Sequence, residues 1–254
     1  MGEGALADDG AKAGKATQAA DAPRITFLCD PAVEDRLPPP QPANRFLPDW
    51  FTSLDREMGM PDPHGLPGLT VKACMPVTDA FSLGWIIPLA CDVRFMVDES
   101  GTGIQAGWPP DAPFQPIEQH HPGQIGAPAA PFERTVPLKW INPWRIKVPE
   151  GYSVLFLHPL NHFELPFRCF SGLVDCDRFD TTVNFPFAWT EAPADVTLAR
   201  GTPIVQLVPV RREALLQGCE VRASTDRELA EQKAAAEKKY GFASTYRREW
   251  RVKK

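Results

Sequence analysis

The prolines of this chain constrain its fold more than any other feature of the sequence. There are 28 prolines among 254 residues, about twice the usual share, and they are spread along the chain. Proline lacks a backbone N–H and its ring clashes with the preceding turn, so helix interiors rarely tolerate it. Long helices are therefore excluded from most of the chain, and short extended segments separated by turns are expected.

Segments rich in β-branched and aromatic residues alternate with proline- and glycine-containing turns through most of the chain. The expected strand segments are residues 24–30, 69–75, 81–99, the segment around 104–108, and residues 137–162, 181–190, 194–201 and 202–210. Strands this short and closely spaced favour a barrel or a sandwich. We therefore predict an all-β fold over residues 24–213, a single barrel or sandwich of jelly-roll-like type, with a long loop over residues 109–137.

The regions that flank this domain differ from it in composition. Residues 1–23 are mainly alanine, glycine, aspartate and lysine, which cannot bury enough apolar surface to fold, so we predict a disordered arm. Residues 214–254 are predicted to form a helical, basic C-terminal extension. A short helix is also expected inside the domain, over residues 46–58, with Trp50 and Phe51 on its apolar face.

The clearest helix signal lies over residues 224–241. Thr225 and Glu228 fit a capping box, alanines fill the middle, and Gly241 fits a C-terminal cap. The apolar face is thin, with Leu229 and several alanines, so we expect the helix on the surface or against a partner. Through this helix the protein would form a homo-oligomer or bind a protein partner.

Charge is distributed unevenly along the chain. The net charge is −5; the segment from Lys238 onward has seven Lys/Arg and one Glu, hence +6, which leaves −11 for the rest. A basic tail could contact nucleic acid, an anionic surface or the acidic body, but such runs are more often solvated. We therefore do not expect nucleic acid as a partner.

The cysteines and the apolar runs indicate a cellular compartment. Six cysteines are scattered without a C-x-x-C pair, which is typical of reduced thiols rather than of a disulfide framework or a structural zinc site. The first residues contain no apolar core of a secretory signal, and no apolar run is long enough to span a bilayer. We expect a cytoplasmic protein without a membrane partner.

His158, His162 and Glu164 are the candidate metal ligands. They stand at the end of an apolar run, and His-x-Glu is the spacing of two of the three ligands in a facial triad. No histidine follows His162, so the third ligand would come from elsewhere: His120, His121, Asp175 or Cys169. The cofactor would then be a divalent metal, and the sequence does not say which one. The alternative is that the two histidines end a strand and form hydrogen bonds with local carbonyl groups.

Asp175 and Asp177 are the candidate catalytic residues. In an extended segment they would share one face, and paired carboxylates suit acid–base chemistry. The alternative is a turn in which aspartate side chains bond backbone groups.

Trp140, Trp144 and Asn161 are the candidate ligand-binding residues. The two tryptophans could stack on a planar small molecule. The alternative for both is a place in the core, beside a turn at Asn142 and Pro143.

Several phrases occur together in a fixed order: VKACMPVTDAFSLGWIIPLACDV, NPWRIKVPEGYSVLFLHPLNH, GLVDCDRF, VNFPF and ARGTPIVQLVPVRRE. From about Ile25 to Glu213 this combination resembles a bacterial and phage family known only as a domain of unknown function. The resemblance carries no activity with it.

A second resemblance concerns the fold. PEGYSVLF, SGLVDCDRFDTTVNFPF and LARGTPIVQLVPV are similar to the β-clip barrel of dUTPases and dCTP deaminases. Gly151 and Gly201 would allow tight turns into strands, and Gln206 would bond a neighbouring backbone. The resemblance implies that Asp175 helps to place the attacking water, and that residues 241–247 are similar to the tail that closes over the phosphates.

Three functions stay open at this level. The first is a small-ligand or metal-binding barrel with a possible enzymatic activity, and the second is a dUTPase-like nucleotide-binding barrel. The third is a structural or assembly protein that docks through its C-terminal helix and basic tail.

Overall fold

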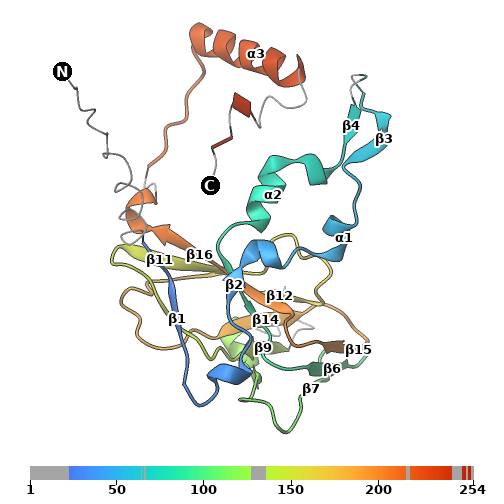
Figure 1. The fold of residues 1–254 in the computed structure, drawn as a ribbon, viewed down its shortest axis with the longest axis vertical. Helices are drawn as coiled ribbons and strands as arrows, with labels where there is room; N and C mark the ends of the chain where they lie inside the picture. Colours follow the sequence, from blue (N-terminus) through green and yellow to red (C-terminus); the bar gives the residue numbers. More distant parts are fainter. Residues whose placement is uncertain are drawn as a thin grey trace, which may run out of the picture.

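A computed structural model describes residues 23–63, 65, 67–126, 136–215, 218–241, 248–249 and 251–252 of the protein. The predicted disordered arm, except for Pro23, and the predicted phosphate-closing tail, except for Gly241, lie outside the described residues. Sixteen strands in the described part form five sheets, accompanied by three α-helices (Figure 1). The predicted all-β fold with a C-terminal helix is confirmed.

The elements alternate with turns along the whole described chain. The strands are β1 (Thr26–Leu28), β2 (Gln41–Pro42), β3 (Glu57–Pro61), β4 (Pro67–Leu69), β5 (Trp85–Pro88), β6 (Val93–Val97), β7 (Ile104–Gly107), β8 (Ile117–Gln119), β9 (Pro137–Trp140), β10 (Arg145–Lys147), β11 (Tyr152–Leu157), β12 (Phe167–Cys169), β13 (Gly172–Val174), β14 (Phe185–Trp189), β15 (Ala194–Leu198) and β16 (Pro203–Arg211). The α-helices are α1 (Asp49–Thr52), α2 (Met75–Phe81) and α3 (Asp226–Gly241).

The largest sheet has the strand order β13-β11-β16-β5-β2, and all its neighbours are antiparallel. Its central strand is β16, the last strand of the described chain. Leu207 of β16 lies opposite Phe156 of β11 on one side and Trp85 of β5 on the other. The sheet therefore depends on a strand that is distant in sequence from both of its neighbours.

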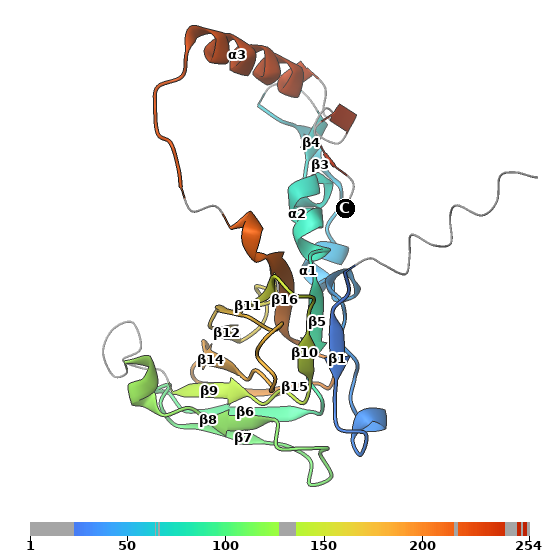
Figure 2. The ribbon, with the colours of Figure 1, turned by 90° about the vertical axis from the view of Figure 1, so that its left-hand side faces the viewer.

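The other sheets are β12-β14-β9-β8, β15-β6-β7, β1-β10 and β3-β4. Figure 2 shows strands β6 to β9 crossing β1 and β5 at a steep angle. Within the described residues each sheet keeps two edge strands, so the layers form a sandwich of open sheets rather than one closed ring. This arrangement encloses a hydrophobic core.

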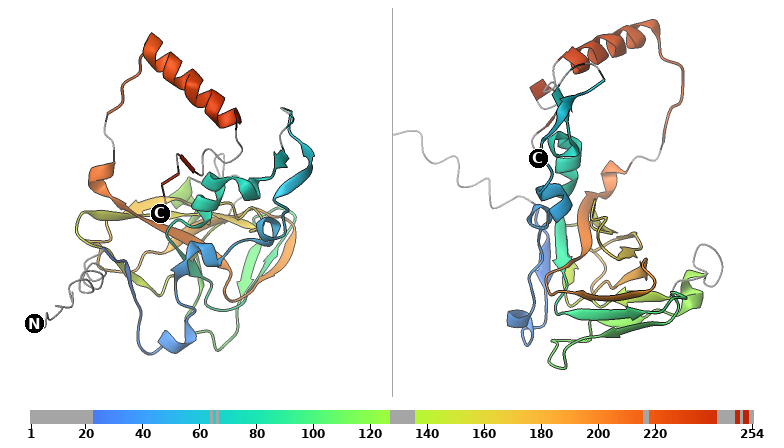
Figure 3. Two further views of the ribbon diagram at one scale, coloured as in Figure 1. Left: turned by 45° about the horizontal axis from the view of Figure 1, so that its top comes forward. Right: turned by 90° about the vertical axis from the view of Figure 1, so that its right-hand side faces the viewer.

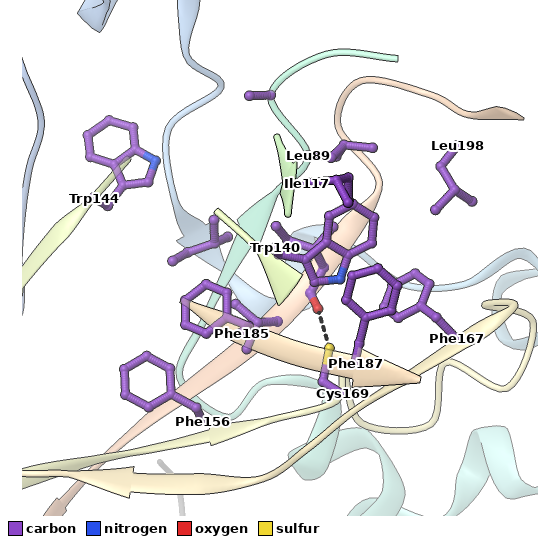
Figure 4. Close-up of a cluster of buried hydrophobic side chains, with 14 of the residues drawn as sticks. Leu89, Ile117, Trp140, Trp144, Phe156, Phe167, Cys169, Phe185, Phe187 and Leu198 are labelled. Atoms are coloured by element: carbon purple, nitrogen blue, oxygen red, sulfur yellow. Dashed lines mark hydrogen bonds between the residues drawn. The ribbon is translucent and has the colours of Figure 1, made fainter. Parts of the chain in front are cut away.

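Aromatic side chains fill the centre of this core (Figure 4). Trp140 is fully buried and stacks on Phe187, with ring centroids 4.4 Å apart, while Phe95 meets Trp140 edge-on at 6.0 Å. The Cys169 thiol donates a hydrogen bond to the carbonyl oxygen of Ile204 at 3.0 Å, and burial raises the pKa of this thiol. Aromatic packing thus joins the β12-β14-β9-β8 sheet to the β15-β6-β7 sheet, and the Cys169 hydrogen bond links them to β16.

Local sequence signals account for several turns and caps. Gly151 and Gly201 have φ angles of 84° and 93°, which confirms the tight turns predicted there. The capping box of α3 is also formed, because the Thr225 backbone N–H donates to a Glu228 carboxylate oxygen at 2.7 Å. In both cases the signal and its structural effect lie within a few residues.

Three sequence predictions of local structure are wrong. The expected strand over residues 69–75 is mostly a turn that leads into α2, where Pro76 at the helix start supplies a preset φ angle. The expected helix over residues 46–58 is only the single turn of α1, and the chain then enters β3. The expected loop over residues 109–137 contains β8, which pairs with β9.

The C-terminal extension lies mostly away from the sheets. Figures 1 and 3 show α3 separated from the body, and Leu229 on its apolar face is 51% exposed. Farther along, Arg251 returns to the body and forms a bidentate ion pair with Asp79 of α2, at 2.7 and 3.1 Å. Among the described residues, no helix combines the length and apolar character needed to cross a membrane.

Candidate functional site

The histidine-containing loop between β11 and β12 forms the centre of the site. The His162 N–H donates to the Pro159 carbonyl oxygen at 3.2 Å, which closes a turn. Asn161 adopts a left-handed conformation with φ of 61°, the kind of backbone angle that asparagine tolerates better than most residues. The Leu160 N–H is held by the Gln206 side chain at 2.8 Å. The loop is therefore fixed in position by β16.

His162 and Glu164 form a hydrogen-bonded pair. His162 is only 5% exposed, and its Nδ1 lies 2.8 Å from a Glu164 carboxylate oxygen. Because a carboxylate oxygen accepts, Nδ1 carries the hydrogen, and in a neutral ring Nε2 is then the acceptor. Nε2 has no hydrogen-bond partner among the described residues. The pair thus presents an oriented and unused proton acceptor.

Trp50 of α1 joins this loop from a distant part of the sequence. Its indole N–H donates to the Asn161 carbonyl oxygen at 3.1 Å. Its ring lies 5.8 Å from the exposed ring of Phe163 and 6.2 Å from the buried ring of Phe81. Phe81 also meets the His162 ring edge-on at 6.3 Å. These contacts place an aromatic cluster beside the imidazole.

A cavity of about 390 Å³ opens between α1 and the histidine loop. Leu47, Pro48, Asp49, Trp50, His162 and Glu164 contribute to its wall. Its volume is within the usual range of small-molecule sites. The two charged residues of the wall, Asp49 and Glu164, are both acidic, and the remaining wall is aromatic or aliphatic apart from His162. Such a wall is electrostatically suited to a positively charged organic group.

The predicted metal site is not assembled. His158 directs Nε2 to the carbonyl oxygen of His162 at 3.2 Å, whereas His162 and Glu164 bond each other. Burial lowers the pKa of His158, and its buried Nδ1 has no hydrogen-bond partner. Within the described residues, no three His, Cys, Asp or Glu side chains converge closely enough to hold a metal ion. His158 instead bonds a local carbonyl oxygen, as the alternative to a metal site predicted.

Other suggested third ligands lie in different surroundings. Cys169 is buried in the hydrophobic core. His121 caps a short 3-10 turn, where its Nδ1 accepts from the Gly123 N–H at 3.1 Å. Neither side chain is grouped with His162.

The predicted catalytic aspartates are held by an arginine. Arg212 donates to both carboxylate oxygens of Asp177, at 2.9 and 2.5 Å, and the Gly151 N–H donates to the same carboxylate at 3.0 Å. Ser153 donates to Asp175 at 2.6 Å. Chiefly because of the hydrogen bonds from Arg212, the pKa of Asp177 is lowered to about 2. This network fixes the end of β16 to the turn after β13, in agreement with the alternative of a turn.

The predicted ligand-binding residues divide between the core and the site. The prediction that Trp140 stacks on a ligand is wrong because the ring is fully buried, and Trp144 is 93% buried in the same core. Asn161 precedes His162 in the loop but does not line the cavity, and its backbone carbonyl oxygen accepts a hydrogen bond from the Trp50 indole. Both tryptophans are therefore core residues, as the alternative predicted.

Asp49 and Trp50 are the site residues that the sequence did not indicate. They are more than 100 positions from His162, and only the fold brings them to it. The aromatic face predicted for residues 46–58 was a partial signal, since it included Trp50 without naming what the ring would contact.

Comparison with known proteins adds no relative. No protein-family model matches the chain, and no curated protein matches it either. The resemblances to a domain of unknown function and to β-clip proteins therefore stay predictions.

Proposed function

We propose that this protein binds a small organic cation in the cavity beside His162, and that His162 accepts a hydrogen bond or a proton from it. The observation that carries the proposal is the His162–Glu164 pair at the wall of an aromatic and acidic cavity. The ligand class is an amine attached to a flat apolar group.

The wall of the cavity supports each part of this ligand. The Trp50 ring can attract a cation through its π face, and Asp49 and Glu164 add negative charge. Leu47 and Pro48 offer apolar surface for the remainder of the molecule. An organic anion would meet two carboxylates and no cationic side chain in the described wall.

The imidazole supplies the chemistry. With Nδ1–H directed at Glu164, the lone pair of Nε2 can accept an N–H hydrogen of an ammonium group. Transfer of that proton would leave a neutral amine and an imidazolium paired with the Glu164 carboxylate. A positioned imidazole of this kind is a common general base in enzymes.

The test uses benzylamine and benzyltrimethylammonium, with benzoate as the anionic counterpart. Isothermal titration or saturation-transfer NMR should detect both cations and little benzoate. Glu164→Gln should weaken both cations by about fivefold, the size of one partly exposed charge interaction. His162→Gln should weaken benzylamine more than benzyltrimethylammonium, because the quaternary ion has no N–H to donate.

Glu191→Gln is the matched control, since Glu191 is exposed and does not line the cavity. It should leave all three affinities unchanged. Equal binding of benzoate and benzylamine, or no effect of Glu164→Gln, would contradict the proposal.

A docking function of the C-terminal helix is the second candidate, favoured by the exposure of Leu229 on α3. We propose that a partner protein would cover this face. Leu229→Glu should abolish capture of a specific partner, while Lys233→Gln on the same helix should not; equal capture by both variants would count against docking.

A further inference from the structure

A second cavity, of about 360 Å³, lies where the β1-β10 ladder meets the five-stranded sheet. Arg24 and Ile25 approach it from the β1 side and Val148 from the end of β10, and Trp85, Tyr152 and Val208 come from β5, β11 and β16. None of the residues that line it also lines the His162 cavity. The two cavities are therefore independent features of the fold.

Two aromatic residues of this cavity carry unused hydrogen-bond donors. Trp85 and Tyr152 are both half-buried. Neither the Trp85 indole N–H nor the Tyr152 hydroxyl has a hydrogen-bond partner within the described part of the chain. Aromatic walls that also present N–H and O–H donors suit a flat ligand with an acceptor group at its edge.

The charge of the wall has the opposite sign to that of the His162 cavity. Arg24, which also interacts with another group of the protein, is the only charged residue among the described residues that line it. The Arg211 guanidinium lies 5.9 Å from the centre of the Tyr152 ring and is also paired with Glu213 at the surface. Positive charge beside aromatic surface favours a negatively charged acceptor, such as a carboxylate.

We infer that this cavity is a second binding site, which takes a flat aromatic organic anion of the carboxylate class. The ring of the ligand packs between Trp85, Tyr152 and the aliphatic wall. Its carboxylate accepts hydrogen bonds from the Tyr152 hydroxyl and the Trp85 indole and interacts with Arg24. This inference is carried by its own cavity and does not rest on the function of the His162 site.

The experiment uses 2-naphthoate as the probe and 2-naphthalenemethanol as its uncharged counterpart, with the full chain. We expect saturable binding of 2-naphthoate and at least fivefold weaker binding of the alcohol. Tyr152→Phe removes one donor to a charged acceptor and should weaken 2-naphthoate by about tenfold. Arg24→Gln should weaken it by about threefold, as expected for an exposed charge.

Arg56→Gln is the matched control, because Arg56 is exposed and lines neither cavity. Methyl NMR spectra of the unmodified chain provide a readout without substitution, and Val148 and Val208 should shift on titration. Equal binding of acid and alcohol, unchanged affinity in Tyr152→Phe, or shifts confined to Leu47 near the other cavity would each overturn the inference. Loss of benzylamine binding in Glu164→Gln with intact 2-naphthoate binding would separate the two sites.

Discussion

Gln206 is the residue whose replacement tests most directly how the site is held in place. Its side chain is 2% exposed in the middle of β16. The amide oxygen accepts from the Leu160 N–H at 2.8 Å, and the amide nitrogen donates to the Leu83 carbonyl oxygen at 2.5 Å. One amide thus connects the histidine loop and the segment after α2 to the central strand. The prediction that Gln206 bonds a neighbouring backbone is confirmed.

Gln206→Leu keeps the side-chain volume and removes both hydrogen bonds. Two backbone groups would lose their partner, and each buried unpaired group costs about 1–3 kcal/mol. Both groups are only partly buried, so water can reach them in the variant and the lower half of that range applies. We expect a loss of about 2–4 kcal/mol in the free energy of unfolding.

Urea unfolding followed by circular dichroism measures this loss, with linear extrapolation to water. Gln105→Leu is the matched control: Gln105 is an exposed glutamine on β7, and its replacement should change stability by less than about 0.5 kcal/mol. Benzylamine affinity should fall in Gln206→Leu, because the loop that carries His162 loses an anchor. A loss below about 1 kcal/mol with unchanged affinity would refute this account of Gln206.

Three further predictions follow from other contacts. Because the pKa of Asp177 is lowered to about 2, its pairing with Arg212 stabilises the fold fully above about pH 4 and is lost as pH falls toward 2. Stability should therefore fall more steeply between these pH values in the unmodified protein than in Asp177→Asn; parallel urea-unfolding profiles would contradict this. Arg251→Gln removes the bidentate ion pair with Asp79, whose side chain is 9% exposed, and should cost about 1–3 kcal/mol in urea unfolding, whereas Lys233→Gln on α3 should cost nothing measurable. Because His162 bonds Glu164 and His158 bonds a carbonyl oxygen, His162→Ala should leave the metal content of protein purified without chelator unchanged in elemental analysis, and loss of an equivalent of iron, zinc or manganese in the variant would contradict these contacts.

Local sequence signals predicted the parts of the fold that depend on interactions between residues close in sequence. The capping box at Thr225 and Glu228 and the turns at Gly151 and Gly201 each depend on a few neighbouring residues, and all of them formed. The strand expected over residues 69–75 did not form. Its composition suits a strand, but Pro76 and the packing of Phe81 favour a helix at its end.

The site was predictable only in part, for the same reason. His162 and Glu164 are two residues apart, so their pairing could be anticipated as a local motif. Trp50 reaches the same cavity through tertiary packing, which no local pattern encodes. Likewise, the sequence indicated the aspartates after β13 as candidate site residues. It did not indicate their partner Arg212, because only the antiparallel pairing of β11 and β16 brings Arg212 to them.

The central position of β16 has a consequence for how the chain is made. Strands β5 and β11 are synthesised before the strand that separates them, and 54 residues lie between the end of β11 and the end of β16. At about 5–20 residues per second, a ribosome needs about 3–11 s to cover that distance. During this time both strands expose an edge of unpaired backbone N–H and C=O groups, which can pair with strands of other nascent chains. Protein yield in cells should therefore depend on chaperones that act on the nascent chain, and slower codons after β11 should increase aggregation.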